Sequence, residues 1–107
     1  MIVSRAAMIG VLCLSVLVAC DGAAVIGTAS LERSQIRTVF VLPEYQHASI
    51  GRQLMARIEQ LAVARGLARL EVPASITAER FYATLGYVSL RDDYYGDERI
   101  IVMEKKL

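Results

Sequence analysis

The chain runs IRTVFVLPEYQHASIGRQLMARIEQLAVARG over residues 36–66, and this stretch decides the fold. The β-branched and apolar residues of 36–42 predict a strand, which Pro43 ends. After a polar loop over 44–49, apolar residues recur at the spacing of an amphipathic helix, at Ile50, Leu54, Ile58 and Leu61. The stretch therefore predicts a strand, a loop and a helix over 50–65.

Residues at both ends of this helix are typical of helix caps. Ser49 is suited to the N-cap, and Gly66 to the stop after the last turn. Residues 68–72 then predict a second strand, which Pro73 ends. A strand, a helix and a strand in this spacing form a βαβ unit, which we expect to have parallel strands and a right-handed crossover.

The C-terminal part of the chain predicts one more helix and two more strands. The helix begins at Ser75 or Thr77 and ends at Gly86, with apolar residues along one side. The last two strands are expected over 87–90 and 100–104, with a polar connection between them.

The N-terminal part of the chain is interpreted as a β-hairpin. Residues 15–20 form its first strand, the pair at 21–22 is an Asp-Gly turn, and residues 25–31 form the returning strand. The element order is then β-β-β-α-β-α-β-β. This order predicts an α/β (α+β) domain built on a mixed sheet.

A second interpretation of the N-terminus treats it as a targeting segment. Arg5 precedes the apolar run 6–20, which has the shape of a secretory signal. Residues 17–20 also resemble a bacterial lipobox, with Cys20 as the lipid-bearing residue and a membrane anchor as the result. The run is short for a transmembrane helix. We favour the hairpin because it joins smoothly to the rest of the chain.

Composition narrows the class of protein. The chain has 107 residues, of which 55% are hydrophobic and 21% charged, and its formal net charge is +1. We therefore expect one folded domain over 1–107, without the basic footprint of a nucleic-acid-binding protein. Cys13, Cys20 and the single histidine match no metal-ligand spacing, so no metal is expected. Two cysteines acting as small buried hydrophobes fit a cytoplasmic protein.

The start of the helix at residue 50 is suited to binding an anion. The first backbone N–H groups of a helix lack partners and carry a partial positive charge, so they bind phosphate without a basic side chain. Ala48, Ser49 and Gly51 are small enough to let an anion approach the backbone. Arg52 can add a charge-assisted contact. The alternative is an ordinary strand-to-helix turn with a serine cap.

Residues 41–55 resemble the coenzyme-A motif of the GNAT N-acetyltransferases. The core of that motif is Gln or Arg, two residues, Gly, one residue, then Gly or Ala. Gln46 and Gly51 match this pattern, and Ser49 stands where its first glycine usually stands. Residues 78–87 are similar to a later helix of the family, in which an aromatic pair precedes a Gly-aromatic step.

This resemblance implies an N-acetyltransferase that uses acetyl-CoA as co-substrate and needs no metal. The acetyl group would pass by direct attack to an amine of a small molecule or a protein. The strand residues would face the pantetheine arm and the acyl carbonyl, and the loop and helix start would hold the pyrophosphate. The implied cofactor-binding residues are Val39, Phe40, Val41, Gln46, His47, Ala48, Ser49, Ile50, Gly51 and Arg52.

Tyr82 is the implied catalytic residue. It stands where the family often places a tyrosine beside the coenzyme sulfur, and there a phenol can protonate the departing thiolate as general acid. The alternative is a core-facing tyrosine with a satisfied hydroxyl. No general base is evident, because Glu44 and Glu71 are typical surface charges and His47 lies in the phosphate loop.

The resemblance covers about residues 15–107. The family usually begins with a strand and two helices, for which residues 1–14 are too few. The expected domain is therefore an atypical apolar segment followed by a family-like core. We expect the sheet edge at residues 15–20 to be covered by residues 1–14 or by a second copy in a homodimer. Two other functions stay open, a non-catalytic coenzyme-A-binding remnant and a lipid-anchored small binding protein.

Overall fold

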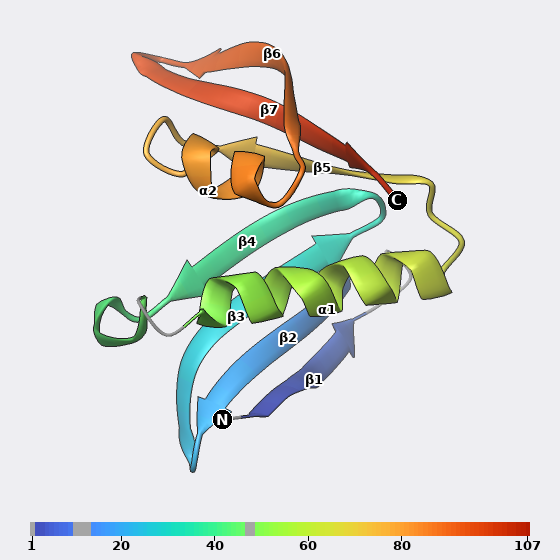
Figure 1. Cartoon of the computed structure of the whole chain (residues 1–107), viewed down its shortest axis with the longest axis vertical. Helices are drawn as coiled ribbons and strands as arrows, with labels where there is room; N and C mark the ends of the chain where they lie inside the picture. Colours follow the sequence, from blue (N-terminus) through green and yellow to red (C-terminus); the bar gives the residue numbers. More distant parts are fainter. Residues whose placement is uncertain (1, 10–13, 47–48) are drawn as a thin grey trace.

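The computed structural model describes residues 2–9, 14–46 and 49–107. In these ranges seven strands form one mixed sheet, in the order β1-β2-β3-β4-β5-β7-β6 (Figure 1). The elements of the described ranges are, in chain order, β1 (Ile2–Ile9), β2 (Leu14–Asp21), β3 (Ala24–Glu32), β4 (Gln35–Val41), the 3-10 helix η1 (Pro43–Tyr45), α1 (Ile50–Ala64), β5 (Arg69–Ala74), α2 (Glu79–Thr84), β6 (Val88–Tyr95) and β7 (Glu98–Lys106). The mixed α/β architecture that the sequence predicts is confirmed.

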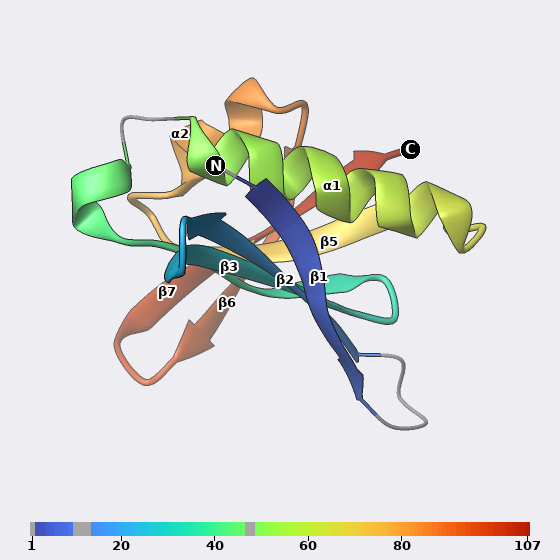
Figure 2. The same cartoon turned by 90° about the horizontal axis from the view of Figure 1, so that it is seen from below.

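Both helices lie on one face of the sheet, as Figure 2 shows. The side of α1 that faces the strands is apolar and buried, through Ile50, Leu54, Met55, Ile58 and Ala62. Burial of one such Leu or Ile side chain contributes about 1.5–3 kcal/mol to stability. In β5 the buried residues Leu70, Val72 and Ala74 face the helices. The intervening residues of β5 therefore face the opposite, helix-free side of the sheet.

Strands β4 and β5 are neighbours that separate toward their C-terminal ends. In the described chain they share a single residue pair, Gln35 with Glu71. Beyond this pair the two strands diverge (Figure 1). We call the resulting gap between β4 and β5 the split. Because no strand fills it, backbone groups along its two edges are left for another partner.

A β-bulge in β4 accompanies this divergence. Ile36 pairs with Leu31 of β3 and Thr38 pairs with Ser30, so that Arg37 has no partner in β3. An extra residue of this kind bends its strand and increases the local twist. The bulge lies two residues after the last pair with β5 and therefore turns β4 away at that point.

The backbone of β4 presents alternate residues to the split. Leu42 donates its N–H to the carbonyl oxygen of Ile26 in the β3 strand region (2.8 Å). Backbone groups alternate in direction along a strand, so Phe40 also turns its N–H and C=O toward β3. Val39 and Val41 consequently turn theirs away from β3 and toward the split.

The predicted end of β5 at Pro73 is wrong, since the strand continues through this proline. Pro73 pairs with Val102 of β7. The N–H of Glu71 donates to the carbonyl oxygen of Ser34 on the β4 side (2.9 Å). The nitrogen of Pro73, two residues further on, faces the same side. There β4 has diverged, so the missing N–H costs no hydrogen bond.

The predicted polar connection over residues 91–99 is also wrong. β6 and β7 remain paired up to Tyr95 and Glu98, and a tight turn at Gly96, which has a φ of 64°, joins them. Almost every residue of β6 is exposed. An exposed edge strand has no buried face, and its sequence therefore lacks the alternation of apolar residues that predicts a strand.

Residues 2–9 form strand β1, which the predicted element order omits. β1 pairs antiparallel with β2 along its length, from Ile2 opposite Cys20 to Ile9 opposite Leu14. Of the two expected ways to cover the edge of residues 15–20, the structure has the one that uses the chain's own N-terminal segment. The hairpin of β2 and β3 is confirmed, with Gly22 in its turn at a φ of 61°.

The predicted helices are confirmed, with one of them shorter. α1 occupies the expected range, and Gly66 follows it at a φ of 77°, as expected of a glycine stop. α2 is limited to Glu79–Thr84. A turn precedes it, in which the N–H of Ala78 donates to the Ser75 hydroxyl (3.3 Å). Ser75 therefore lies before the helix instead of opening it.

Candidate functional site

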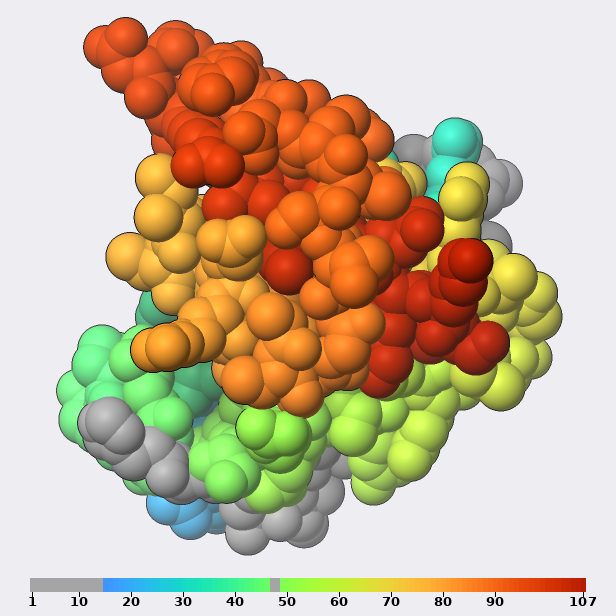
Figure 3. Space-filling model, turned by 45° about the horizontal axis from the view of Figure 1, so that its top comes forward, coloured from blue at the N-terminus to red at the C-terminus, as the bar shows by residue number. Residues whose placement is uncertain are grey.

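A cavity of about 620 Å³ lies where β4 ends and α1 begins, beside α2. In Figure 3 the orange atoms of the α2 segment lie against the green atoms of the first turns of α1. The wall combines β4, the loop before α1, the first turn of α1 and the α2 segment, through Val39, Val41, Gln46, Ser49, Gly51, Arg52, Thr77, Ala78, Phe81 and Tyr82. The cavity thus occupies the wide end of the split on the helix-covered face.

The first turn of α1 presents N–H groups at this cavity for which the described residues supply no acceptor. The first intrahelical hydrogen bond runs from the N–H of Gln53 to the carbonyl oxygen of Ser49 (3.1 Å). The N–H groups of Ile50, Gly51 and Arg52 therefore have no acceptor within the helix. Together with the helix dipole they form a site of partial positive charge, suited to a phosphate group.

Ser49 occupies the predicted N-cap position, in an unexpected conformation. Its φ of 62° and ψ of 19° are left-handed, and its side chain makes no capping hydrogen bond. A left-handed residue turns the chain sharply from the loop into the helix, which glycine does with less strain. The side chain of Ser49 lines the cavity instead of capping α1.

Gly51 allows α1 and α2 to approach each other. A Cβ atom built on Gly51 would lie 3.3 Å from Cζ of Phe81. This separation is tighter than ordinary van der Waals contact, so any side chain here would push Phe81 away. Glycine at this position therefore closes the cavity wall between the two helices.

The loop before α1 is tied to the strands by two hydrogen bonds. Nε2 of Gln46 donates to the carbonyl oxygen of Val41 (3.3 Å), which is a group that faces the split. The Tyr45 hydroxyl donates to the carboxylate of Asp21 in the β2–β3 hairpin (3.0 Å). This bond favours the neutral phenol and raises the pKa of Tyr45. The predicted site residues 47–48 lie outside the described residues.

Three more of the predicted cofactor-binding residues, Arg52, Phe40 and Ile50, differ in how they meet the cavity. Arg52 is exposed, lines the cavity and forms no ion pair in the described chain. Phe40 is directed elsewhere, because its backbone pairs toward β3 and its side chain is 52% exposed outside the cavity wall. Ile50 is buried in the core at 1% exposure, so only its backbone can meet a ligand. The backbone of Phe40 is thus already paired with β3, and its contact with a bound arm stays a prediction.

Tyr82 lies in the cavity wall with its ring in the core. It is 6% exposed and makes edge contacts with Phe81 (5.2 Å between ring centroids) and with Tyr87 (5.9 Å). Burial raises the pKa of Tyr82 above 10.0, since the phenolate is disfavoured there. The Tyr82 hydroxyl has no hydrogen-bond partner in the described chain. Every fully buried side-chain oxygen among the described residues does have a partner, so the Tyr82 hydroxyl is not fully buried. The hydroxyl is therefore open to solvent in the cavity and free to donate.

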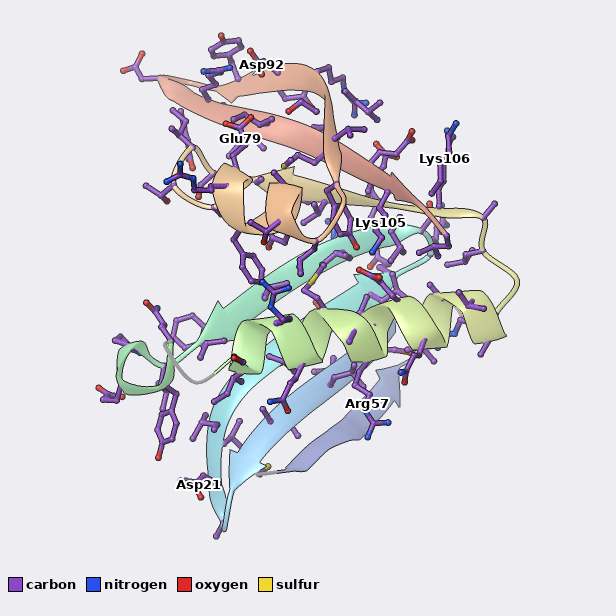
Figure 4. All side chains as sticks on the ribbon, in the orientation of Figure 1. Asp21, Arg57, Glu79, Asp92, Lys105 and Lys106 are labelled. Atoms are coloured by element: carbon purple, nitrogen blue, oxygen red, sulfur yellow. The ribbon has the colours of Figure 1, made fainter. Side chains whose placement is uncertain are left out.

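A polar cluster of Tyr87, Glu59 and Lys105 lies behind Tyr82, and the sequence alone does not predict it. The Tyr87 hydroxyl donates to one carboxylate oxygen of Glu59 (3.1 Å), and Nζ of Lys105 donates to the other (2.8 Å). Lys105 also lies over the Tyr87 ring, 5.8 Å from its centroid, and Figure 4 shows it reaching from β7 toward α1. Burial and the Glu59 carboxylate raise the pKa of Tyr87. The cluster fixes the ring against which Tyr82 packs, and no local motif announces it.

Neither carboxylate considered as a general base lies in the cavity wall. Glu44 is exposed on η1. Glu71 lies on the helix-free side of the sheet, where it pairs with Arg91 (3.6 Å). In the described residues no group of His, Cys, Asp and Glu side chains is arranged to hold a metal ion. The cavity therefore offers an anion site and a proton donor. Thr77, Ala78 and Phe81 also line it. Ala78 and Phe81 lie in the segment 78–87 that resembles the later helix of the family, and Thr77 lies directly before it.

The sheet topology, the split and the cavity define an acyltransferase-like α/β fold, and comparisons with known proteins agree. A family model described as "Acetyltransferase (GNAT) domain" matches residues 13–107. A crystal structure from Rhodopseudomonas palustris, titled a GCN5-related N-acetyltransferase, is 32% identical with a TM-score of 0.82, over 88% of this chain and 62% of its own. The chain thus spans less than two thirds of that relative.

More distant structures share the fold. The IAA acetyltransferase from Bacillus cereus is 20% identical with a TM-score of 0.82, over 88% of this chain and 78% of its own. An N-acetyltransferase from Thermoplasma acidophilum, crystallised in complex with coenzyme A, is 23% identical with a TM-score of 0.77, over 88% of this chain and 61% of its own.

The chain belongs to the GNAT acetyltransferase family. The family match includes strand β2 with Cys20, in agreement with the hairpin of β2 and β3. None of the helices in the described residues has the length and apolar character needed to cross a membrane.

Proposed function

We propose that this chain binds acetyl-CoA in the split between β4 and β5 and transfers the acetyl group to an amine by direct attack. One observation carries the proposal. A single cavity joins the N–H groups at the start of α1, which have no acceptor among the described residues, the free backbone edge of β4, and Tyr82. These supply an anion site, a site for an extended amide-containing arm and a proton donor.

The pyrophosphate is assigned to the start of α1. The N–H groups of residues 50–52 supply donors, and the guanidinium of Arg52 supplies a charge-assisted contact. Ser49 adds its hydroxyl, which lines the cavity. Gln46 and the two residues that follow it complete the loop, so His47 and Ala48 belong to the same proposed site by their position in the chain.

The pantetheine arm is assigned to the edge of β4. Its amide groups can pair with the backbone of Val39 and Val41, as an added strand pairs with a free sheet edge. The Gln46 side chain now bonded to Val41 would exchange this contact for one with the arm. The acetyl thioester then lies deep in the split, beside Tyr82.

The chemistry needs a neutral amine and an acid for the leaving group. The amine nitrogen attacks the acetyl carbonyl carbon and forms a tetrahedral intermediate, which collapses as the carbon–sulfur bond breaks. The amide product loses its extra proton to water, and the coenzyme thiolate takes a proton from the Tyr82 hydroxyl. Tyr82 suits this role because its raised pKa keeps the phenol protonated. The proposed unit is one domain over residues 1–107, acting on an amine of a small molecule or a protein.

A calorimetric titration tests donor binding. Acetyl-CoA should bind, and S-acetylpantetheine, which lacks the pyrophosphate, should bind at least about 10-fold more weakly because charge-assisted contacts are lost. Arg52→Met should weaken acetyl-CoA binding. The matched control is Arg57→Met, which removes the same charge from the exposed side of α1 and should leave binding unchanged. An absence of heat and of any thermal shift with acetyl-CoA would overturn the proposal.

A thiol-release assay over a panel of amines tests turnover. Release of coenzyme A that depends on an added amine supports the transferase. Tight binding of acetyl-CoA without release over the whole panel would instead identify a coenzyme-A-binding protein without activity. The two assays together separate donor binding from catalysis.

A further inference from the structure

A second, smaller cavity lies at the narrow end of the split. Its volume is about 160 Å³, and Gln35 and Glu71, the last pair that joins β4 to β5, both line it. Its other residues include Pro73, which lies on the helix-free side of β5. The two cavities therefore flank the same split, one on each face of the sheet.

The two arginines that line this cavity differ in their pairing with carboxylates. Arg91 is paired with two carboxylates, Glu71 at 3.6 Å and Asp93 at 3.4 Å. Arg37 also lines the cavity, and the one contact it makes in the described chain is a donation to Oε1 of Gln35 (3.0 Å). The cavity thus contains a guanidinium without a carboxylate partner beside a group of two carboxylates that share one cation. A ligand that complements it carries an anionic and a cationic group close together.

The position of Arg37 follows from the bulge in β4. The extra residue lies beside the cavity at the point where β4 leaves β5. Bulges of this kind redirect side chains. The bulge at the narrow end of the split therefore also places Arg37 beside this cavity.

We propose that this second cavity binds the amine acceptor and that Arg37 selects acceptors with a carboxylate next to the amine, as in α-amino acids. This inference rests on the proposed acetyl transfer. The acceptor carboxylate would make charge-assisted hydrogen bonds with the guanidinium of Arg37. The amino group lies between Glu71 and the split, from which it reaches the acyl carbon. A volume of 160 Å³ equals that of about five waters, which fits the head group of an amino acid with its side chain directed outward.

The test compares acceptors that differ in the carboxylate alone. L-alanine, L-glutamate and L-phenylalanine are each assayed against their α-carboxamides for coenzyme A release. The wild type should prefer each acid in kcat/KM, and Arg37→Met should lower kcat/KM for the acids by about 10- to 100-fold while leaving the amides unchanged. The comparison is made between variant and wild type for each acceptor, so that the different basicity of the amines cancels.

Two further variants sharpen the result. Arg37→Lys keeps the charge without the bidentate geometry and should restore part of the preference. Arg57→Met removes an arginine from the side of α1 away from α2, as Figure 4 shows, and should change neither class of acceptor. An equal loss for acids and amides in Arg37→Met, or no loss for the acids, would overturn the proposal.

A binding measurement separates this inference from the proposed function. The same amino acids are titrated into protein loaded with coenzyme A, or into free protein if the coenzyme does not bind. Binding that Arg37→Met abolishes supports the acceptor site even without turnover, in which case only the catalytic proposal fails. No binding of any of the acids to the wild type would overturn the inference whatever the fate of acetyl-CoA.

Discussion

Tyr82 combines a buried ring with a hydroxyl that is open to the cavity. The aromatic contacts with Phe81 and Tyr87 fix the ring, and the latter is itself held by Glu59 and Lys105. An ordinary core tyrosine would bond its hydroxyl to the protein, and Tyr87 does so in this chain. Tyr82 and Tyr87 lie five residues apart and differ in one respect: the hydroxyl of Tyr87 is hydrogen-bonded within the described chain, and that of Tyr82 is not.

Tyr82→Phe should lower kcat by about 100-fold and leave the Kd for acetyl-CoA nearly unchanged, because the ring stays and only the proton donor is lost. The pKa of Tyr82 lies above 10.0. The phenol is the active form, so the proton donor is present at lower pH and is lost as the pH rises through this raised pKa. Steady-state profiles at neutral and mildly alkaline pH should therefore show no decline from this group. A phenylalanine variant with wild-type kcat would assign the proton to water instead.

Ser49 is strained where the family motif usually has glycine. Ser49→Gly should raise the free energy of unfolding by about 0.5–1 kcal/mol, because relief of the left-handed backbone exceeds the entropy cost of glycine. Ser49→Val is the opposite control and should destabilise the protein, since a β-branched residue tolerates a φ of 62° poorly. Urea unfolding measures both. A destabilised glycine variant would show that the serine side chain contributes more than its backbone costs.

At the scale of elements, apolar periodicity and capping residues in the sequence predict the helices and where they end. The apolar stripe of α1 and the stop at Gly66 are local signals, and the structure confirms both. The coenzyme-A motif likewise identifies the loop and helix start that line the cavity. Features that depend on a neighbouring strand have no such signal. Pro73 remains in β5 because β4 diverges beside it, and neither strand's own residues reveal that divergence.

The site was predictable to the same extent. The motif predicted those cavity-lining residues that lie close together in the sequence, among them Gln46 and Gly51. The sequence grouped Phe40 with Val39 and Val41, because a sequence does not show which backbone groups of a strand are already paired. The bulge at Arg37 and the cluster of Tyr87 with Lys105 and Glu59 arise from contacts between distant segments. Such contacts become visible only when the strands are in register.

Hydrogen exchange tests the alternation along β4. In the free protein the amides of Val39 and Val41 face the split and should exchange quickly, whereas the amide of Phe40, paired toward β3, should be protected. Saturating acetyl-CoA should slow exchange at Val39 and Val41 by about 10-fold or more, because the bound arm supplies acceptors and excludes water. NMR of the labelled protein resolves the three amides. Equal protection of all three in the free protein would contradict the assigned strand direction.

At the scale of the whole molecule, the chain forms two parts that meet at the split. Strands β1 to β4 with α1 make one part, and β5 to β7 with α2 make the other. A single residue pair joins β4 to β5, and on the helix side the two parts share one hydrophobic core and the ion pair of Lys105 with Glu59. A ligand bound between the parts would contact both, so we expect donor binding to stabilise the whole molecule.

β1 lies at the edge of the sheet that is farthest from the split. Removing residues 1–13 would leave the backbone groups of β2 unpaired along a strand with apolar side chains such as Leu17, and an edge of this kind pairs with other chains. The shortened protein should therefore sediment as dimers or larger species at concentrations where the full chain sediments as a monomer. Its affinity for acetyl-CoA should stay nearly the same, since β2, β3 and β4 still separate the edge from the cavity. A shortened chain that remained monomeric would show that β1 is not needed to protect this edge, and a loss of acetyl-CoA binding would show that the edge and the cavity are coupled through α1.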